Sequence, residues 1–294
     1  PEVAEELLAD GCADLVSMAR PFLADADFVA KAEAGRAETI APCIACNQAC
    51  LDHTFSGKIS TCLVNPQACH ETELVITPTQ QAKRIGIVGA GPAGLSAAMT
   101  AAQRGHDVTL FDREPRIGGQ LNMARAIPGK EEFDGLVDWY QTMLADHGVT
   151  LRLGQAVEPG GLVDFDEVVV ATGVLPRDPG IPGQDRPNVL SYVDVLKNRA
   201  PVGRRVAIVG AGGIGFDVAE FLVHEGDSPT ENLAEWKAEW GVGDPADARG
   251  GLAPEGPQPA PPARQVTLLQ RKAERPGKRL GKTTGRIHRL SLRM

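Results

Sequence analysis

A glycine-rich turn between a strand and a helix occurs twice in this chain, and this repeat limits the possible folds most. The stretch RIGIVGAGPAGLSAA places Gly89, Gly91 and Gly94 directly after an apolar strand and at the start of a helix. In such a turn the first glycine permits the tight bend, the second lets a pyrophosphate approach the backbone, and the third lets helix and strand pack closely. The helix N-terminus then offers free N–H groups to phosphates. The pattern predicts a parallel α/β sheet with a dinucleotide site.

The acidic residue that such a site needs stands at the end of the next expected strand, 107–112. Asp112 follows Gly89 by 23 positions, where its carboxylate is placed to accept ribose hydroxyls. A turn that merely needs glycine is the alternative interpretation. The strand, the helix and the acid together favour the nucleotide site.

The second unit, RRVAIVGAGGIGFDVAEFL, carries Gly210, Gly212 and Gly215 at the same spacing. No acid follows at the expected distance, because about forty residues separate its helix from the strand QVTLLQ. Arg271 and Lys272 come directly after that strand. Two cations there suit a 2′-phosphate and favour NADP over NAD, with a solvated basic patch as the alternative.

The rest of the chain from residue 83 onward fits the same α/β pattern. Helices are expected over 92–105 and 131–148, and buried strands over 150–154 and 165–173. Two dinucleotide units with VVVATG between them fit a flavin and a nicotinamide better than two nicotinamides. Ahead of this region, residues 13–23 have the continuous apolar character of a buried strand within a mostly helical stretch.

The net charge of −8 over 294 residues argues against a general nucleic-acid binder. Residues 264–294 contain ten Arg or Lys against one acid, but they lack interleaved aromatic residues and surround a nucleotide fold. No apolar run approaches the roughly 20 residues of a membrane helix, and no charged-then-apolar signal pattern appears in the first residues given. We therefore expect no nucleic acid and no membrane as partners, and a cytoplasmic location in which thiols stay reduced.

Four cysteines stand at the spacing C-x2-C-x3-C-x11-C, namely Cys43, Cys46, Cys50 and Cys62. Thiolates in this pattern enclose either an iron–sulfur cluster or a tetrahedral zinc. Three close ligands around one small object favour iron–sulfur, because zinc sites more often use two separated C-x2-C pairs. We expect Cys12 to be core packing and leave Cys69 out of the ligand set.

At this point the sequence resembles a known family. The segments ADLVSMARPFLADADFVAKA, CIACNQACLDHTFSGKISTC, GGQLNMARAIPGKEEF and LLQRKAERPGKRLGKTTGRIHR are similar to bacterial NADPH-dependent 2,4-dienoyl-CoA reductases. These belong to the NADH:flavin oxidoreductase (Old Yellow Enzyme-like) group, to which trimethylamine dehydrogenase is more distantly related. The resemblance implies that NADPH reduces FAD, that FAD feeds a [4Fe-4S] cluster, and that the cluster reduces FMN in a barrel where a dienoyl-CoA of unsaturated fatty acid β-oxidation binds.

Residue by residue, the resemblance implies contacts with each of these cofactors. The cluster ligands are Cys43, Cys46, Cys50 and Cys62. The FAD-contacting positions are Gly89, Gly91, Gly94, Asp112, Gly119, Gln120, Thr172 and Gly173, and the resemblance implies a backbone contact at Val157 as well. The NADPH side comprises Gly210, Gly212, Gly215, Arg271 and Lys272, and the FMN phosphate rests near Met18, Ala19 and Arg20.

The implied fold is α/β, with two Rossmann-like units preceded by the tail of a TIM (β/α)8 barrel and an iron–sulfur segment. We expect the barrel end at 1–40, the cluster segment and linker at 41–82, the FAD domain at 83–200 and the NADPH domain at 201–294. Because the chain starts with Pro1 and stops at Met294 shortly after a strand, we expect an internal fragment of a longer protein. No catalytic acid can then be named, and substrate chain length, product double-bond position and oligomeric state stay open. Another activated alkene, an amine, a standalone electron-transfer module and a zinc-stabilised binding protein remain alternatives.

Overall fold

The computed structural model describes residues 1–293, which form two compact units. The first unit contains Pro1–Leu121 and Glu132–Arg177, and the second contains Asn122–Glu131 and the chain from Asp178 onward. The sequence-based boundary at residue 200 differs from this division. The reason is that α7 (Tyr192–Leu196) packs against α8 (Gly213–Val223) of the second nucleotide fold.

A four-stranded parallel sheet forms the centre of the first unit. Its strands are β1 (Arg84–Val88), β2 (Asp107–Asp112), β3 (Thr150–Leu153) and β4 (Glu167–Val170). They follow the order β3-β2-β1-β4, with Ile87 of β1 opposite Leu110 on one side and Val169 on the other. All four expected strands are present. The succession of strands along the sheet reverses between β1 and β4, which is the topological switch point of the sheet.

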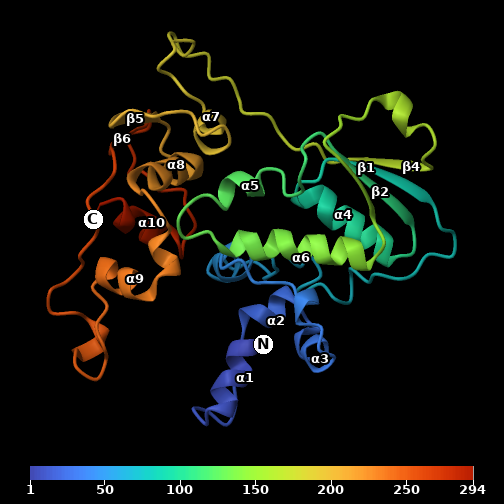
Figure 1. Cartoon of the computed structure of the whole chain (residues 1–294), viewed down its shortest axis with the longest axis horizontal. Helices are drawn as coiled ribbons and strands as arrows, with labels where there is room; N and C mark the ends of the chain where they lie inside the picture. The colour runs from blue at the N-terminus through green and yellow to red at the C-terminus, as the bar shows by residue number, and fades with distance from the viewer. Residues whose placement is uncertain (294) are drawn as a thin grey trace. The chain divides into compact units, whose positions relative to one another are not determined.

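Two helices cover this sheet, α4 (Pro92–Gln103) and α6 (Glu132–Asp146). Figure 1 shows them side by side next to β1 and β2. Leu95 of α4 and Leu144 of α6 are fully buried with Leu110 of β2. The apolar positions of α6 recur every three to four residues, which is why one face of this helix enters the core.

The segment before the sheet is held by short helical elements. These are α1 (Glu2–Ala9), α2 (Arg20–Ala24), α3 (Phe28–Glu33), the 3-10 turn η1 (Ala37–Thr39) and the π-turn η2 (Gln48–Asp52). The strand expected within 13–23 is wrong: residues 13–19 are irregular, and Leu15 is 79% exposed. None of the strands described within residues 1–293 pairs with this segment, so its apolar run has no sheet to enter.

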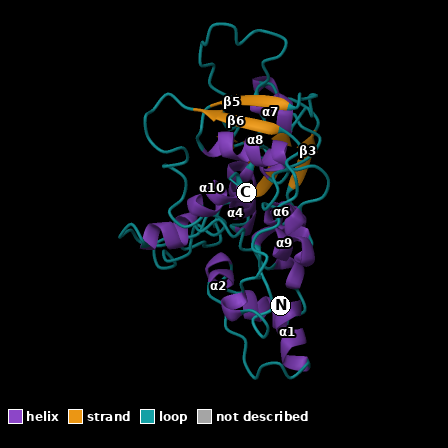
Figure 2. Cartoon of the chain, turned by 90° about the vertical axis from the view of Figure 1, so that its left-hand side faces the viewer, coloured by secondary structure: helices purple, strands orange, loops and turns teal. Residues whose placement is uncertain are grey.

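The second unit contains two parallel strands, β5 (Arg205–Val209) and β6 (Gln265–Leu269). Figure 2 shows them side by side with α8 below them. Other helical elements are α9 (Leu233–Trp240), α10 (Gly285–Ser291), η4 (Pro229–Glu231) and η5 (Arg249–Gly251), while α5 (Leu121–Ala124) and η3 (Pro159–Leu162) occur earlier in the chain. A small core of Ile127, Val195, Leu196, Val218 and Leu222 holds this unit together.

Strand β4 was expected to be buried, and this is wrong. It lies at the edge of the first sheet, and all four of its residues are exposed, Val170 to 73%. An edge strand with apolar side chains on both faces gives the same sequence signal as a central strand. Among the helices described in residues 1–293, none combines the length and apolar character needed to cross a bilayer.

Candidate functional site

The first glycine-rich turn has the backbone that a dinucleotide loop requires. Gly89 has a φ of +109°, a conformation that residues with a side chain rarely adopt. A Cβ at Gly94 would collide with the carbonyl oxygen of Gly89. A Cβ at Gly91, in contrast, would meet no protein atom within 4 Å. Gly91 therefore leaves open space in front of the N-terminus of α4, where a phosphate group would lie.

Asp112 ends β2 and braces this loop. Its Oδ2 atom accepts a hydrogen bond from the N–H of Ala90 at 2.6 Å, and its Oδ1 atom accepts one from the N–H of Glu114 at 2.8 Å. A carboxylate oxygen has more than one lone pair, so each keeps capacity for a hydroxyl group. The predicted contact with a ribose stays a prediction. The structure adds a second role, which is to fix the glycine loop against β2.

Other predicted FAD-contacting residues gather at the same edge of the sheet. A Cβ at Gly119 would lie 2.9 Å from the Cα of Gly91. The side-chain amide of Gln120 donates to the carbonyl oxygen of Val174 at 3.2 Å, next to Gly173. Thr172 follows β4 and lies against Gly89. The carboxyl ends of parallel strands meet at one edge, which is where open α/β sheets bind ligands.

Val157 lies in the loop after β3, where its side chain packs against Gly161. The neighbouring Gln155 donates its N–H to the backbone oxygen of Asp112 at 3.2 Å. The loop that carries Val157 thus starts close to the nucleotide edge.

The second turn repeats the design in the second unit. Gly210 has a φ of +124°, and a Cβ at Gly215 would collide with the Gly210 carbonyl oxygen. A Cβ at Gly212, the N-cap of α8, would again meet no protein atom within 4 Å. The N–H of Gly210 donates to the oxygen of Leu269 at 2.8 Å, which joins this loop to the end of β6.

Arg271 and Lys272 follow β6 at this same edge. Both side chains are exposed, and neither forms an ion pair with any described residue of the chain. Gln270 holds their backbone, because its side-chain amide donates to the carbonyl oxygen of Lys272 at 2.9 Å. Nearby, Glu274 neutralises two other cations, Lys278 at 3.4 Å and Arg279 at 3.6 Å. The two cations predicted for a 2′-phosphate are therefore uncommitted.

The four cysteines of the predicted cluster set line one small pocket in the first unit. Its volume is about 20 Å³, and its lining is almost wholly apolar. The lining residues are Arg20, Leu23, Cys43, Ile44, Cys46, Asn47, Ala49, Cys50, Cys62 and Leu63. The pocket packs on the nucleotide fold itself, because Ile44 and Val64 belong to the same buried core as β1 and β2, with Cys46 and Cys62 against it.

Backbone groups point at two of the sulfurs. The N–H of Val64 donates to Sγ of Cys62 at 3.4 Å, and the N–H of Gln48 donates to Cys46. Burial raises the pKa of the Cys46 thiol, and the neighbouring Cys50, Cys62 and Cys43 raise that pKa further. Four thiols are thus close enough to oppose one another's ionisation, which a bound cation would relieve.

The sulfurs do not yet converge on one point. Among residues 1–293, no three His, Cys, Asp or Glu side chains stand close enough together to hold a metal ion. A group larger than a water molecule therefore requires the two cysteine arms, 43–50 and 62, to move apart. The expectation that Cys12 is buried is wrong, since it is exposed, as is Cys69.

The three residues predicted near an FMN phosphate surround the start of α2. Met18 is half-buried, Ala19 is the exposed N-cap, and Arg20 begins the helix. The guanidinium of Arg20 donates to Oδ1 of Asn47 at 2.7 Å, and so lies at the cysteine pocket. The contact with FMN stays a prediction.

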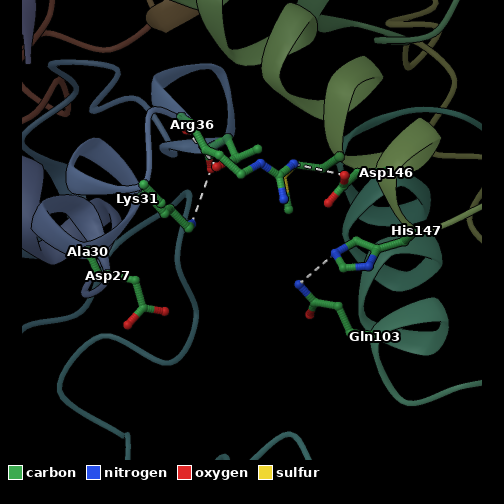
Figure 3. Close-up of a pocket in the computed structure, with 10 residues that line it drawn as sticks. Asp27, Ala30, Lys31, Arg36, Gln103, Asp146 and His147 are labelled. Atoms are coloured by element: carbon green, nitrogen blue, oxygen red, sulfur yellow. Dashed lines mark hydrogen bonds and ion pairs between the residues drawn. The ribbon is translucent and has the colours of Figure 1, made fainter.

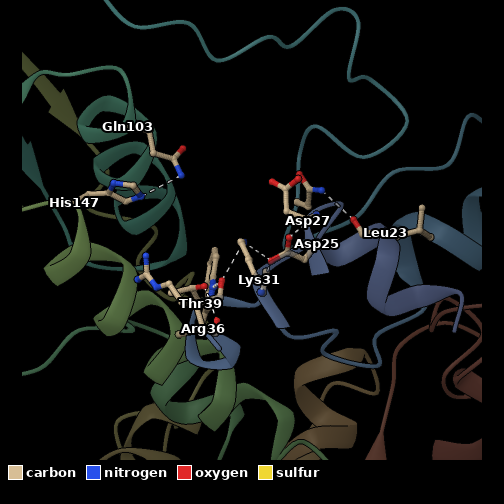
Figure 4. A network of polar contacts seen from close by, with 11 residues as sticks. Leu23, Asp25, Asp27, Lys31, Arg36, Thr39, Gln103 and His147 are labelled. Carbon is tan, nitrogen blue, oxygen red and sulfur yellow. Dashed lines mark hydrogen bonds and ion pairs between the residues drawn. The ribbon is translucent and has the colours of Figure 1, made fainter. Parts of the chain in front are cut away.

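A second pocket, of about 380 Å³, was missed by the sequence analysis (Figure 3). Two of its charged groups are paired with each other: Arg36 donates to Asp146 at 2.8 Å, and this bond raises the pKa of Arg36. Lys31 binds the buried carboxylate of Asp25 at 2.6 Å and the carbonyl oxygen of Thr39 at 3.1 Å (Figure 4). The Lys31 contacts hold the segment before the cysteines together, whereas the Arg36–Asp146 bond and the indole of Trp139, which donates to the carbonyl oxygen of Thr39 at 2.9 Å, fasten it to α6.

Comparisons with known proteins agree with this architecture. The model of a family described as pyridine nucleotide-disulphide oxidoreductase matches residues 83–284. That range contains both glycine-rich turns and the strand that precedes Arg271.

Two curated relatives match most of the chain. This chain is 40% identical over 239 residues to a metal reductase of Desulforamulus reducens, and the alignment covers 79% of this chain and 36% of that protein. It is also 35% identical over 232 residues to a cinnamate reductase of Clostridium sporogenes, and this alignment covers 78% of this chain and 35% of that protein. The chain thus spans about a third of the length of these relatives.

One solved structure matches this chain over its whole length. The structure of a 2-naphthoyl-CoA reductase in complex with 2-naphthoyl-CoA aligns with a TM-score of 0.83 and 27% identity. The alignment covers 100% of this chain and 39% of that one. The similarity therefore includes the helical segment and the cysteine segment as well as the two nucleotide folds.

Proposed function

The chain belongs to the pyridine nucleotide-disulphide oxidoreductase family and is related to Old Yellow Enzyme-like flavin oxidoreductases, and from this premise we propose that it is the electron-input part of an alkene reductase. In this proposal the first loop holds FAD, the second holds NADPH, and the four cysteines hold a [4Fe-4S] cluster. The observation that carries the proposal is that the cysteine pocket and the first loop share one buried core.

The FAD role rests on the edge formed by β1, β2 and β4. The N-terminus of α4 faces the open space beside Gly91 and offers its N–H groups to a pyrophosphate. Asp112 holds the loop and keeps lone pairs for a ribose, while Gln120 and Gly173 close the same edge. When bound there, FAD supplies two-electron acceptance and one-electron release.

The preference for NADPH rests on the uncommitted Arg271 and Lys272. The N-terminus of α8, next to Gly212, orients the pyrophosphate in the same way as in the first unit. Two cations at the end of the second strand then pair with a 2′-phosphate that NADH lacks. The basic stretch beyond them adds positive potential around an anionic cofactor.

The donors and the apolar walls of the cysteine pocket support an iron–sulfur cluster, which would enter once the two cysteine arms, 43–50 and 62, move apart. Cys43, Cys46, Cys50 and Cys62 supply four thiolates, and apolar walls exclude water. The two backbone N–H groups that point at Cys46 and Cys62 stabilise negative charge on sulfur. A cluster bound there supplies one-electron transfer out of the first unit.

The substrate proposal is an unsaturated acyl-CoA, with 2,4-dienoyl-CoA in β-oxidation as the first candidate. The sequence resemblance motivates it, and the similar structure carries an acyl-CoA as well. Steady-state turnover of the full-length protein with 2,4-dienoyl-CoA, enones and trimethylamine separates the candidates. Absence of NADPH oxidation with the dienoyl-CoA removes the first one, and activity with the amine alone favours the amine alternative.

Cofactor analysis of the anaerobically reconstituted chain tests the proposal. We expect about four iron and four sulfide per chain, together with one FAD. Cys46→Ser should lose most of the iron, whereas Cys12→Ser, at an exposed cysteine outside the pocket, should retain it. One zinc per chain with no sulfide would contradict the proposal and favour a zinc-stabilised binding protein.

A further inference from the structure

Helix α2 is fastened to both arms of the cysteine segment. Arg20 donates from Nη1 to Oδ1 of Asn47, the residue after Cys46, at 2.7 Å. On the other arm, shortly after Cys62, the side-chain amide of Asn65 donates to the backbone oxygen of Leu23 at 3.0 Å. Arg20 and Leu23 both line the cysteine pocket. One short helix thus forms a wall of the pocket and connects the two cysteine arms.

Arg20 is the one charged side chain among the residues that line this pocket within the described chain. It forms no ion pair with any residue of 1–293, and the partner of its guanidinium is the neutral amide of Asn47. Its positive charge is therefore not cancelled by a carboxylate of the described chain. Apart from the amide of Asn47, the other walls are apolar or carry the thiols themselves.

The backbone of the first cysteine arm fixes the place of this charge. Asn47 has a left-handed conformation with a φ of +56°, which asparagine tolerates better than most residues. It is the N-cap of the π-turn Gln48–Asp52, which carries Cys50. Because Asn47 stands between Cys46 and that turn, its side-chain oxygen holds the exposed guanidinium at the cysteine pocket.

We propose that Arg20 sets the reduction potential of the four-cysteine centre as its fixed positive charge, and that Asn47 positions it. The inference rests on the proposed cluster. Adding one electron to such a centre increases its negative charge, and a nearby cation lowers the free energy of that state. The guanidinium is exposed, so solvent weakens its effect. Removing the charge should shift the ratio of reduced to oxidised centre by about three- to tenfold, and tenfold corresponds to 59 mV for one electron.

Redox titration of the reconstituted 294-residue chain tests this inference, with iron and sulfide content measured on each sample. Arg20→Gln keeps a side-chain N–H donor for Asn47 but removes the charge, whereas Arg20→Lys keeps the charge. The matched control is Arg36→Gln, at an arginine that pairs with Asp146 and lines the other pocket. We expect a lower midpoint potential in Arg20→Gln at unchanged iron content, and near wild-type values in Arg20→Lys and the control.

Two results would overturn the inference. The first is an unchanged potential in Arg20→Gln, which would leave Arg20 as a structural clamp for α2. The second is an equal decrease of the midpoint potential in Arg36→Gln, which would show that the effect comes from the overall net charge of the protein. If the wild-type chain takes up no iron and sulfide, the proposed function itself is wrong and this inference falls with it. If Arg20→Gln loses its iron, the midpoint potential of Asn47→Ala is measured instead. The inference predicts a lower potential in Asn47→Ala, because the charge of Arg20 is then no longer held in place. An unchanged potential in Asn47→Ala would count against the inference.

Discussion

The turn at Gly89–Gly94 and the turn at Gly210–Gly215 have the same backbone geometry, yet the strands behind them are buried to very different extents. Ile85, Gly86 and Ile87 of β1 are buried, whereas no residue of β5 is buried and Val209, its last residue, is 71% exposed. In both turns the third glycine leaves no room for a Cβ, and the second leaves open space. The local design therefore depends on the glycines and not on the size of the sheet behind them.

The residues at the end of the second strand distinguish the two units. In the first, Asp112 ends the strand and binds the loop through Ala90. In the second, the strand leads into Arg271 and Lys272, which stay free of carboxylates among the described residues. The same turn is thus completed by a negative charge in one unit and by positive charges in the other. These side chains are the basis for the proposed assignment of FAD to the first unit and NADPH to the second.

The largest expected effect comes from closing the open space in each turn. Gly91→Ala should weaken FAD binding by at least about tenfold, since its methyl group blocks backbone N–H groups from the phosphates. Gly212→Ala should do the same to NADPH alone. Both variants should keep the wild-type melting temperature, because a Cβ at either position meets no protein atom within 4 Å. Isothermal titration with each nucleotide checks this, and loss of FAD binding in Gly212→Ala would break the assignment.

The second effect concerns the cations of the second unit. Arg271→Ala with Lys272→Ala should weaken NADPH binding by about 10- to 100-fold, because charge-assisted hydrogen bonds to a 2′-phosphate are lost. NADH binding should change little. Arg249→Ala, at an exposed arginine in η5, serves as the control. Equal losses for NADPH and NADH would show that these cations contribute only a general positive field.

The smallest effect is on stability and is confined to the second unit. Burial raises the pKa of Glu220 on α8, although Ser291 donates to its carboxylate at 2.5 Å. The native state therefore holds this proton more tightly than the unfolded state. The contribution of this carboxyl group to the stability of the native state is fully present below the ordinary pKa of 4.5. It is lost as the pH rises through the raised pKa of the folded protein.

Glu220→Gln should remove that dependence and raise the melting temperature at neutral pH. Glu225→Gln, an exposed neighbour, should leave the dependence intact. Thermal melts from mildly acidic to neutral pH measure it, followed by tryptophan fluorescence in a Trp139→Phe background, so that only Trp236 and Trp240 of the second unit report. A Glu220→Gln curve that parallels the wild type would contradict the assignment to this carboxyl group.

The sequence predicts the central elements of the fold because strand, glycine turn and helix are local. Strands β1, β2 and β6 and helices α4, α6 and α8 occur close to their expected ranges. Burial is less predictable, because it depends on neighbours: Val170 and Cys12 were expected inside and are exposed. An apolar stretch does not reveal whether another element lies next to it.

The candidate site likewise combines features that the sequence predicts with contacts that it does not predict. Spacing predicts that three of the four cysteines share one pocket, since they lie within eight residues, whereas Cys62 reaches it through the fold of the following loop. The contact between Arg20 and Asn47 joins residues 27 positions apart, and no periodicity predicts it. The pocket lined by Lys31, Arg36 and Asp146 likewise depends on the packing of separate helices.

Anaerobic reduction by NADPH tests the central claim most directly. The chain reconstituted with iron and sulfide is mixed with NADPH in the presence and in the absence of FAD, and the flavin band and the broad cluster absorption are recorded together. The account predicts that both bands decrease when FAD is bound and that the cluster stays oxidised without it. Equal reduction of the cluster without FAD, or bleaching of FAD with an unchanged cluster, would contradict the account.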